Sequence, residues 1–267
     1  MELRSKHVVV TGAGSGIGRA CATRFAAEGA RVVVADLDLQ AAQATAAGID
    51  AQAVQTDVGR EAEIVALVKR AQEAGGPIDL FFSNAGVPGP AGGPEVSDAE
   101  LQATWEVNVL AHLWAARALL PDMLERGEGY LLSTASAAGL LTQVSALAYS
   151  ITKHAAVALA EWLSIMYADA GIKVSCLCPQ AVRTPMLEAA LEDPVGAAPL
   201  LAGGLIEPDE VAEAVVAGLR EERLLILPHE EVAHHLSLKG SQPERWLNGM
   251  RRIVRHARAE GGEAPAG

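Results

Sequence analysis

Cysteine is scarce in this sequence, with only three residues among 267: Cys21, Cys176 and Cys178. Cys176 and Cys178 are two residues apart in an apolar segment, so both lie on the same face of a predicted strand. No second cysteine pair and no histidine at ligand spacing accompanies them, which argues against a metal site. The three cysteines are therefore interpreted as small core residues.

Basic residues are also in deficit. The chain has 21 lysines and arginines against 33 acidic residues, which gives a formal charge of −12. Nucleic acids and anionic membranes repel a chain of this charge. Neither is expected as a partner.

A long apolar run is missing from the amino terminus. The first residues, MELRSKHVVVTG, contain only three consecutive valines before a threonine and a glycine. Such a run is too short for a signal peptide or a membrane-spanning helix, so a cytoplasmic protein is expected. With 50% apolar and 20% charged residues, the composition is typical of a packed globule.

Short β-branched or apolar segments alternate with alanine-rich segments, a rhythm typical of βαβ units. The predicted strands cover 7–11, 31–35, 51–56, 78–83, 130–134, 172–178 and 224–227. The predicted helices cover 16–28, 39–47, 60–74, 98–126, 148–170 and 208–222. The pattern predicts an α/β fold, a Rossmann-like doubly wound parallel sheet of about seven strands with ligands at its carboxyl edge.

Residues 1–228 are predicted to form one catalytic domain, and 229–267 a helical extension with a disordered end. Within the domain, 185–206 is apolar but interrupted by prolines and glycines, which favours a lid over the substrate. In the extension, Trp246, Met250, Ile253 and Ala257 follow helical spacing, while the arginines fall mostly on other faces. This amphipathic helix could cap its own cleft, contact a neighbouring subunit or pack locally.

A glycine-rich turn follows the first predicted strand and opens an alanine-rich helix. Glycine lets backbone N–H groups approach a pyrophosphate, and the helix amino terminus adds a favourable field. Asp36 ends the second predicted strand, where a carboxylate accepts from ribose hydroxyls and repels a 2′-phosphate; NAD is therefore favoured over NADP. The candidate cofactor residues of this region are Gly12, Ser15, Gly16, Ile17, Gly18, Asp36 and Leu37.

The pentapeptide YSITK places Tyr149 and Lys153 four residues apart on one face of a predicted helix. A phenol of ordinary pKa, about 10, is a poor proton donor or acceptor at neutral pH. A nearby ammonium favours the phenolate and is expected to lower that pKa. The pair is a candidate for acid–base chemistry.

With these three motifs, residues 6 to about 228 resemble the short-chain dehydrogenase/reductase family. Further residues match the family's order and spacing, and Ser136 precedes Tyr149 by thirteen positions. These residues are Asp57, Val58, Asn84, Ala85, Gly86, Asn108, Ser136, Tyr149 and Lys153. Ser133 and Thr134 are neighbouring alternatives to Ser136, but the thirteen-residue interval favours Ser136.

The resemblance implies an NAD-dependent oxidoreductase that interconverts a secondary alcohol and a ketone on an apolar molecule. Tyr149 would be the general acid or base, Lys153 would hold the nicotinamide ribose, and Ser136 would orient the reacting oxygen. Asn108 would anchor a water that relays the proton, although it could instead simply bend its helix. Of the cofactor residues, Asp57 and Val58 would contact the adenine, Asn84, Ala85 and Gly86 would support the adenosine side, and Val182 and Thr184 would hold the carboxamide.

The sequence departs from the family pattern in two places. Gln180 replaces a glycine after the sixth predicted strand. Glutamine would be strained if that position requires positive φ, and otherwise its side-chain amide could reach the substrate or the cofactor. After Leu227 the chain lacks the terminal segment of the ketoacyl-reductase branch, which weakens an acyl-carrier function. The nearby histidines, the isolated His229 and the adjacent pair His234 and His235, form no convincing ligand set, so no metal is expected.

Other functions remain open. A family enzyme of another reaction type, such as a dehydratase or epimerase, and a non-catalytic NAD-binding sensor are the alternatives. Family members commonly pair through the helices that here begin near Ser97 and Ala148, which predicts a homodimer or homotetramer.

Overall fold

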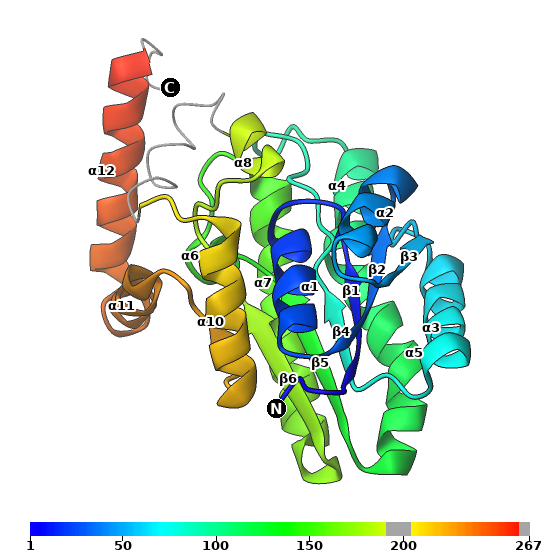
Figure 1. Ribbon diagram of the computed structural model, residues 1–267. Coiled ribbons are helices and arrows are strands. Elements are labelled where there is room, and N and C mark those ends of the chain that lie inside the picture. Colours follow the sequence, from blue (N-terminus) through cyan, green and yellow to red (C-terminus); the bar gives the residue numbers. More distant parts are fainter. Residues whose placement is uncertain (191–203, 262–267) are drawn as a thin grey trace.

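The computed structural model describes residues 1–190 and 204–261, which form a three-layer α/β structure around one sheet (Figure 1). All seven strands are parallel, in the order β3-β2-β1-β4-β5-β6-β7. Their bounds are β1 His7–Thr11, β2 Arg31–Asp36, β3 Gln52–Gln55, β4 Leu80–Ser83, β5 Gly129–Thr134, β6 Ile172–Leu177 and β7 Leu225–Ile226. The predicted doubly wound parallel sheet is confirmed.

Helices cover both faces of the sheet. The helices before the extension are α1 Gly16–Ala27, α2 Leu39–Ala47, α3 Glu61–Gly75, α4 Asp98–Trp105, α5 Ala111–Arg126, α6 Ala138–Leu141, α7 Leu147–Tyr167, α8 Pro185–Ala190 and α10 Pro208–Arg220. Because successive strand residues point to opposite faces, Val9 packs with α3, α5 and α7, whereas Val8 and Val10 pack with α1, α2 and α10. This double burial explains the continuous valine runs in the sequence.

The predicted helix 98–126 is interrupted. Between α4 and α5 lies a π-helical segment, Glu106–Leu110, and the short helix α6 was not predicted at all. Two predicted strands also begin later than expected, β3 at Gln52 and β4 at Leu80. Boundaries of this kind depend on backbone hydrogen bonds that composition does not encode.

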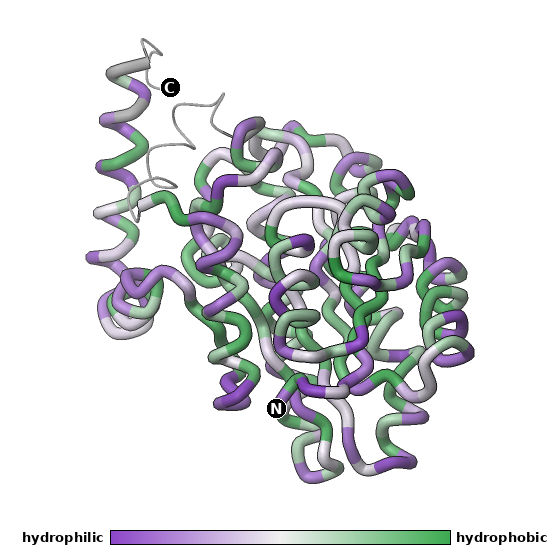
Figure 2. Tube along the Cα trace, viewed as in Figure 1, coloured by the Kyte–Doolittle hydropathy of each residue, from purple (hydrophilic) through white to green (hydrophobic). Residues whose placement is uncertain are grey.

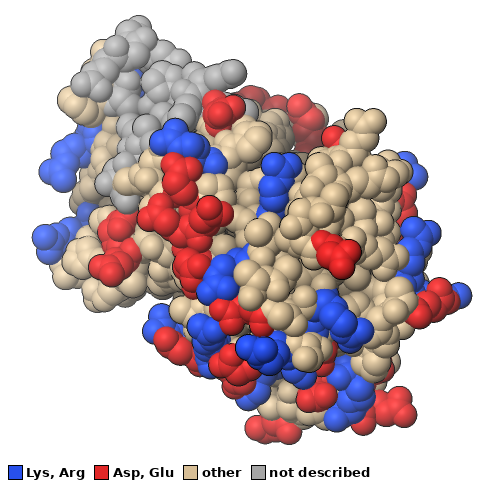
Figure 3. All heavy atoms as spheres, in the orientation of Figure 1, with Lys and Arg blue, Asp and Glu red and all other residues tan. Residues whose placement is uncertain are grey.

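Ion pairs fasten the outer layer. Arg24 on α1 pairs with Glu213 on α10, and Arg220 at the end of α10 pairs with Glu28. The lower part of the face in Figure 3 shows basic and acidic side chains interspersed, as such pairs require. No described helix is long and apolar enough to span a membrane.

The carboxyl-terminal extension contains two helices, α11 Glu230–Ser241 and α12 Pro243–Gly261, where one amphipathic helix was predicted. They meet at Pro243, which lacks the N–H that a continuous helix needs. Helix α12 stands beside the domain with alternating apolar and polar residues along it (Figure 2). Residues 191–203 of the predicted lid and 262–267 of the predicted disordered end lie outside the described residues.

Candidate active site

A cavity of about 710 Å³ opens at the carboxyl edge of the sheet. It is lined by every cofactor residue predicted from the sequence, together with Ser136. Those cofactor residues are Gly12, Ser15, Gly16, Ile17, Gly18, Asp36, Leu37, Asp57, Val58, Asn84, Ala85, Gly86, Tyr149, Lys153, Val182 and Thr184. Asn108 is the one predicted site residue that does not line it.

The glycine turn is shaped for close backbone approach. Gly12 has φ +62°, and a Cβ there would lie 2.8 Å from Cα of Ala85. A Cβ on Gly18 would collide with the carbonyl oxygen of Gly12. Gly16 has φ +51° and faces Thr184, whose Cγ2 would be 3.1 Å from an added Cβ. Side chains are thus excluded where α1 begins and where a pyrophosphate would meet its amino terminus.

Asp36 is fixed at the end of β2 by backbone donors. Its Oδ2 accepts from the Gly14 amide at 2.8 Å, and its Oδ1 accepts from the Asp38 amide at 3.0 Å. The carboxylate is therefore held on the cavity wall next to the glycine turn. Sequence reasoning overlooked Arg19, which follows the turn, but its guanidinium bonds to the Gly14 carbonyl and to Thr45, and it does not line the cavity.

Asn84 ties three strand ends together. Its Nδ2 donates to the carbonyl of Thr11 at 3.0 Å, and its Oδ1 accepts from Oγ1 of Thr134 at 3.1 Å. The hydroxyl of Thr11 in turn accepts from the amides of Asn84 and Ala85. These hydrogen bonds connect the ends of β1, β4 and β5 beside the cavity.

Asn108 is fully buried inside the π-helical segment. Its Oδ1 accepts from the amide of Val87 at 2.9 Å, while its Nδ2 donates to the carbonyl of Val87 at 2.9 Å and to Thr152 at 3.2 Å. Both ends of the amide are engaged within the protein. The side chain therefore holds the loop at Val87, and the predicted anchoring of a water by Asn108 stays a prediction.

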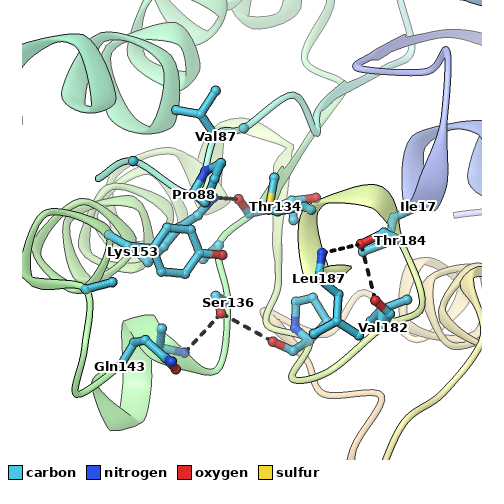
Figure 4. A pocket seen from close by; sticks show the side chains of 18 of the residues that line it. Ile17, Val87, Pro88, Thr134, Ser136, Gln143, Lys153, Val182, Thr184 and Leu187 are labelled. Atoms are coloured by element: carbon cyan, nitrogen blue, oxygen red, sulfur yellow. Dashed lines mark hydrogen bonds between the residues drawn. The ribbon is translucent and has the colours of Figure 1, made fainter. Parts of the chain in front are cut away.

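Ser136, Tyr149 and Lys153 lie together beside the end of β5. Figure 4 shows Ser136 and Lys153 on the cavity wall. Oγ of Ser136 accepts from the Ala138 amide at 3.1 Å and donates to the Pro179 carbonyl at 3.4 Å. Nζ of Lys153 lies 5.5 Å from the centre of the Tyr149 ring and donates to the carbonyl of Thr134 at 3.0 Å. The helical i, i+4 spacing thus brings the phenol and the ammonium together as predicted.

The predicted lowering of the Tyr149 pKa is not found. Burial raises the pKa of this phenol, and the hydrogen bond with Ser136 offsets only part of that effect. Lys153 is itself 3% exposed, and burial lowers its pKa to about 8, with a partial offset from Cys176 and Cys178. The expectation was wrong because it counted the charge of Lys153 and left out the desolvation of both groups.

The loop after β6 carries the residue that replaces the family glycine. Gln180 has no positive φ, so glutamine is not strained there. Its backbone amide donates to Nδ1 of His229 at 3.2 Å, and Nε2 of His229 lies 3.1 Å from the carbonyl of Ala181. Sequence reasoning considered His229 only as a metal ligand, and no cluster that could hold a metal occurs among the described residues.

The remaining wall of the cavity is largely apolar. Val87, Pro88 and Leu141 contribute to it, as do Met186 and Leu187 of α8. The extension supplies His235, Trp246, Met250 and Ile253. Helix α12 therefore caps the cleft of its own subunit, which was one of the predicted alternatives.

Known proteins are similar to this chain in both sequence and fold. The family model for short chain dehydrogenases matches residues 6–194. The 1-deoxy-11-beta-hydroxypentalenate dehydrogenase of Streptomyces exfoliatus is 36% identical, over 92% of this chain and 95% of its own. The estradiol 17-beta-dehydrogenase 11 of Mus musculus is 32% identical, over 92% and 83%. A short chain dehydrogenase/reductase from Burkholderia phymatum in complex with NAD has a TM-score of 0.80 and 32% identity, over 100% and 98%.

Proposed function

The chain belongs to the short-chain dehydrogenase family, and from this we propose that it is an NAD-dependent enzyme oxidising an apolar secondary alcohol to a ketone, or the reverse. The observation that carries the proposal is the convergence of Ser136, Tyr149 and Lys153 on one cavity with the glycine turn. The relatives are named as dehydrogenases of hydroxylated compounds, a hydroxypentalenate and estradiol. The apolar wall of the cavity suits substrates of that kind.

The residues present fit a nicotinamide dinucleotide. The glycines of the turn from Gly12 to Gly18 leave room for its pyrophosphate, and the fixed carboxylate of Asp36 suits the hydroxyls of its adenosine ribose. The absence of a cationic lining side chain beside Asp36, among the described residues, favours NAD over NADP. When bound, the cofactor supplies a nicotinamide ring that accepts or gives a hydride.

Tyr149 moves the proton. In oxidation its phenolate takes the proton of the substrate hydroxyl, and in reduction its phenol returns a proton to the ketone oxygen. Ser136, hydrogen-bonded to Tyr149, would turn its hydroxyl proton from the Pro179 carbonyl to the same substrate oxygen and so fix its position. Lys153 has donor capacity beyond its bond to Thr134, and can hold the nicotinamide ribose while its charge stabilises the phenolate.

We also propose that two copies pair through α7. Trp162, Ile165 and Met166 on this helix are 53%, 79% and 55% exposed. Three large apolar side chains on consecutive turns of one helix form a surface that association would cover.

The test is NADH formation by the pure protein with NAD and a panel of secondary alcohols, from cyclohexanol to decalinols and estradiol. The proposal expects oxidation of the larger apolar alcohols, and loss of that activity in Tyr149→Phe. A dehydratase or epimerase would consume substrate without net NADH, and a non-catalytic sensor would bind NAD without turnover. Either result would overturn the proposal.

A further inference from the structure

His229 lies at the junction between β7 and α11 and is 3% exposed. Its ring reaches back to the loop that follows the neighbouring strand, β6. Nδ1 lies 3.2 Å from the amide nitrogen of Gln180, and Nε2 lies 3.1 Å from the carbonyl oxygen of Ala181. One imidazole thus spans the two residues joined by a single peptide bond.

The two hydrogen-bond partners of the ring determine its tautomer. The Gln180 amide can only donate, so Nδ1 must be the unprotonated nitrogen. The Ala181 carbonyl can only accept, so Nε2 must carry the proton. The neutral ring therefore satisfies both contacts at once. With both nitrogens occupied, His229 is available neither for proton transfer nor for a metal.

Residues 180–184 form the loop that the His229 ring clamps through its bonds to Gln180 and Ala181. This loop adjoins groups in both halves of the site. Just before the clamp, the carbonyl of Pro179 accepts from Ser136 and from the Ala137 amide. Just after it, Val182 and Thr184 line the cavity, with Thr184 facing Gly16 of the glycine turn. A shift of the clamped residues would therefore move the part of the wall predicted to hold the nicotinamide carboxamide.

We propose that His229 is a positioning residue for the nicotinamide half of the cofactor, acting through the loop formed by 180–184. The proposal rests on the proposed use of NAD. Where the family pattern has glycine, this chain has Gln180. The backbone N–H of Gln180 donates to His229, a side chain from the extension. The extension therefore takes part in cofactor binding as well as in covering the substrate.

The test compares binding of NAD with binding of ADP-ribose, which has the same adenosine and pyrophosphate but no nicotinamide. Both dissociation constants are measured by calorimetry on the full chain. His229→Leu removes both hydrogen bonds at similar volume, His229→Asn keeps a group near the Nδ1 position, and His229→Gln keeps one near the Nε2 position.

Apparent affinity falls with the fraction of molecules whose loop is correctly placed. Loss of one buried hydrogen bond corresponds to about tenfold in that equilibrium. The dissociation constant for NAD is therefore expected to rise by about tenfold or more in His229→Leu. The dissociation constant for ADP-ribose should change by less than about threefold. His229→Asn and His229→Gln should fall between His229→Leu and the parent, as partial rescue requires.

His7→Leu is the matched control. His7 is also a buried histidine, 2% exposed, with Nδ1 3.0 Å from the Gly76 carbonyl oxygen. It is the first residue of β1, whereas the cavity lies at the carboxyl end of this strand. Its replacement should lower the melting temperature without changing the ratio of the two dissociation constants.

Four results would overturn the proposal. They are an unchanged ratio in His229→Leu, an equal change in His7→Leu, a parent that gains nothing from the nicotinamide, and failure of all three His229 variants to fold where His7→Leu folds. The proteins could show the expected loss of NAD affinity in His229→Leu while the parent oxidises no alcohol. That result would contradict the proposed function but not the positioning role of His229. If the parent prefers NADP, the ratio compares the dissociation constants of NADP and 2′-phospho-ADP-ribose.

Discussion

Replacing Lys153 with methionine is predicted to stabilise the folded protein at neutral pH and to abolish turnover. Burial lowers the pKa of Lys153 from 10.5 to about 8. That difference corresponds to roughly 3 kcal/mol against the folded state at neutral pH. Methionine removes the buried charge but also the bond to the Thr134 carbonyl, worth about 1 kcal/mol. The expected gain is about 2 kcal/mol, or roughly 5 °C in Tm.

The gain should depend on pH in a defined direction. The Lys153 pKa is lower in the folded protein than in the unfolded chain, so the folded state binds fewer protons between about pH 8 and pH 10.5. The stability of the parent therefore rises with pH across this window. The advantage of Lys153→Met is complete below pH 8 and disappears as the pH approaches 10.5.

Thermal unfolding without cofactor, followed by circular dichroism at several pH values, measures this difference. Lys69→Met is the control, because the Lys69 side chain is 76% exposed and forms a surface ion pair with Glu73. It should change Tm little at any pH. A Lys153→Met protein that melts below the parent at neutral pH, or a gain that does not shrink at high pH, would refute the reasoning.

Four further predictions concern catalysis, cofactor, substrate and assembly. Tyr149→Phe should keep NAD affinity but lose about 10²–10⁴-fold in kcat, and turnover within about threefold of the parent would reject Tyr149 as the acid–base group. Asp36→Ala should raise kcat/KM with NADP relative to NAD by about tenfold or more, and an unchanged ratio would show that this carboxylate does not select the cofactor. Trp246→Ala should raise kcat/KM for bulky alcohols relative to small ones, and the same ranking in both proteins would remove α12 from the specificity wall. Ile165→Asp should convert a dimer into a monomer in light scattering, and a monomeric parent would exclude the α7 interface.

The sequence alone predicted the parallel sheet and most of the cavity. Strand and helix periodicity are local properties, so the valine runs and alanine-rich segments were sufficient to place β1, β2 and the main helices. The glycine turn, Asp36 and the i, i+4 pair of Tyr149 and Lys153 were readable for the same reason. Each motif specifies its geometry within a few residues of the chain.

Long-range contacts could not be read in this way. The Asn108 side chain forms two hydrogen bonds with the backbone of Val87, 21 residues away. These bonds depend on how the π-helical segment packs against the loop after β4. The raised pKa of Tyr149 and the lowered pKa of Lys153 both follow from burial, which is a property of the packed structure.

The extension shows the same division. The spacing of Trp246, Met250 and Ile253 predicted an amphipathic helix, but three surfaces were open to it, and only the tertiary structure placed it over its own cavity. The sequence did not determine the role of His229, because an imidazole can bind a metal, transfer a proton or form hydrogen bonds with backbone groups. The fold decided among these by bringing Gln180 and Ala181 to its two nitrogens from 49 and 48 residues away, since a side chain's chemistry is fixed by the groups that surround it in space.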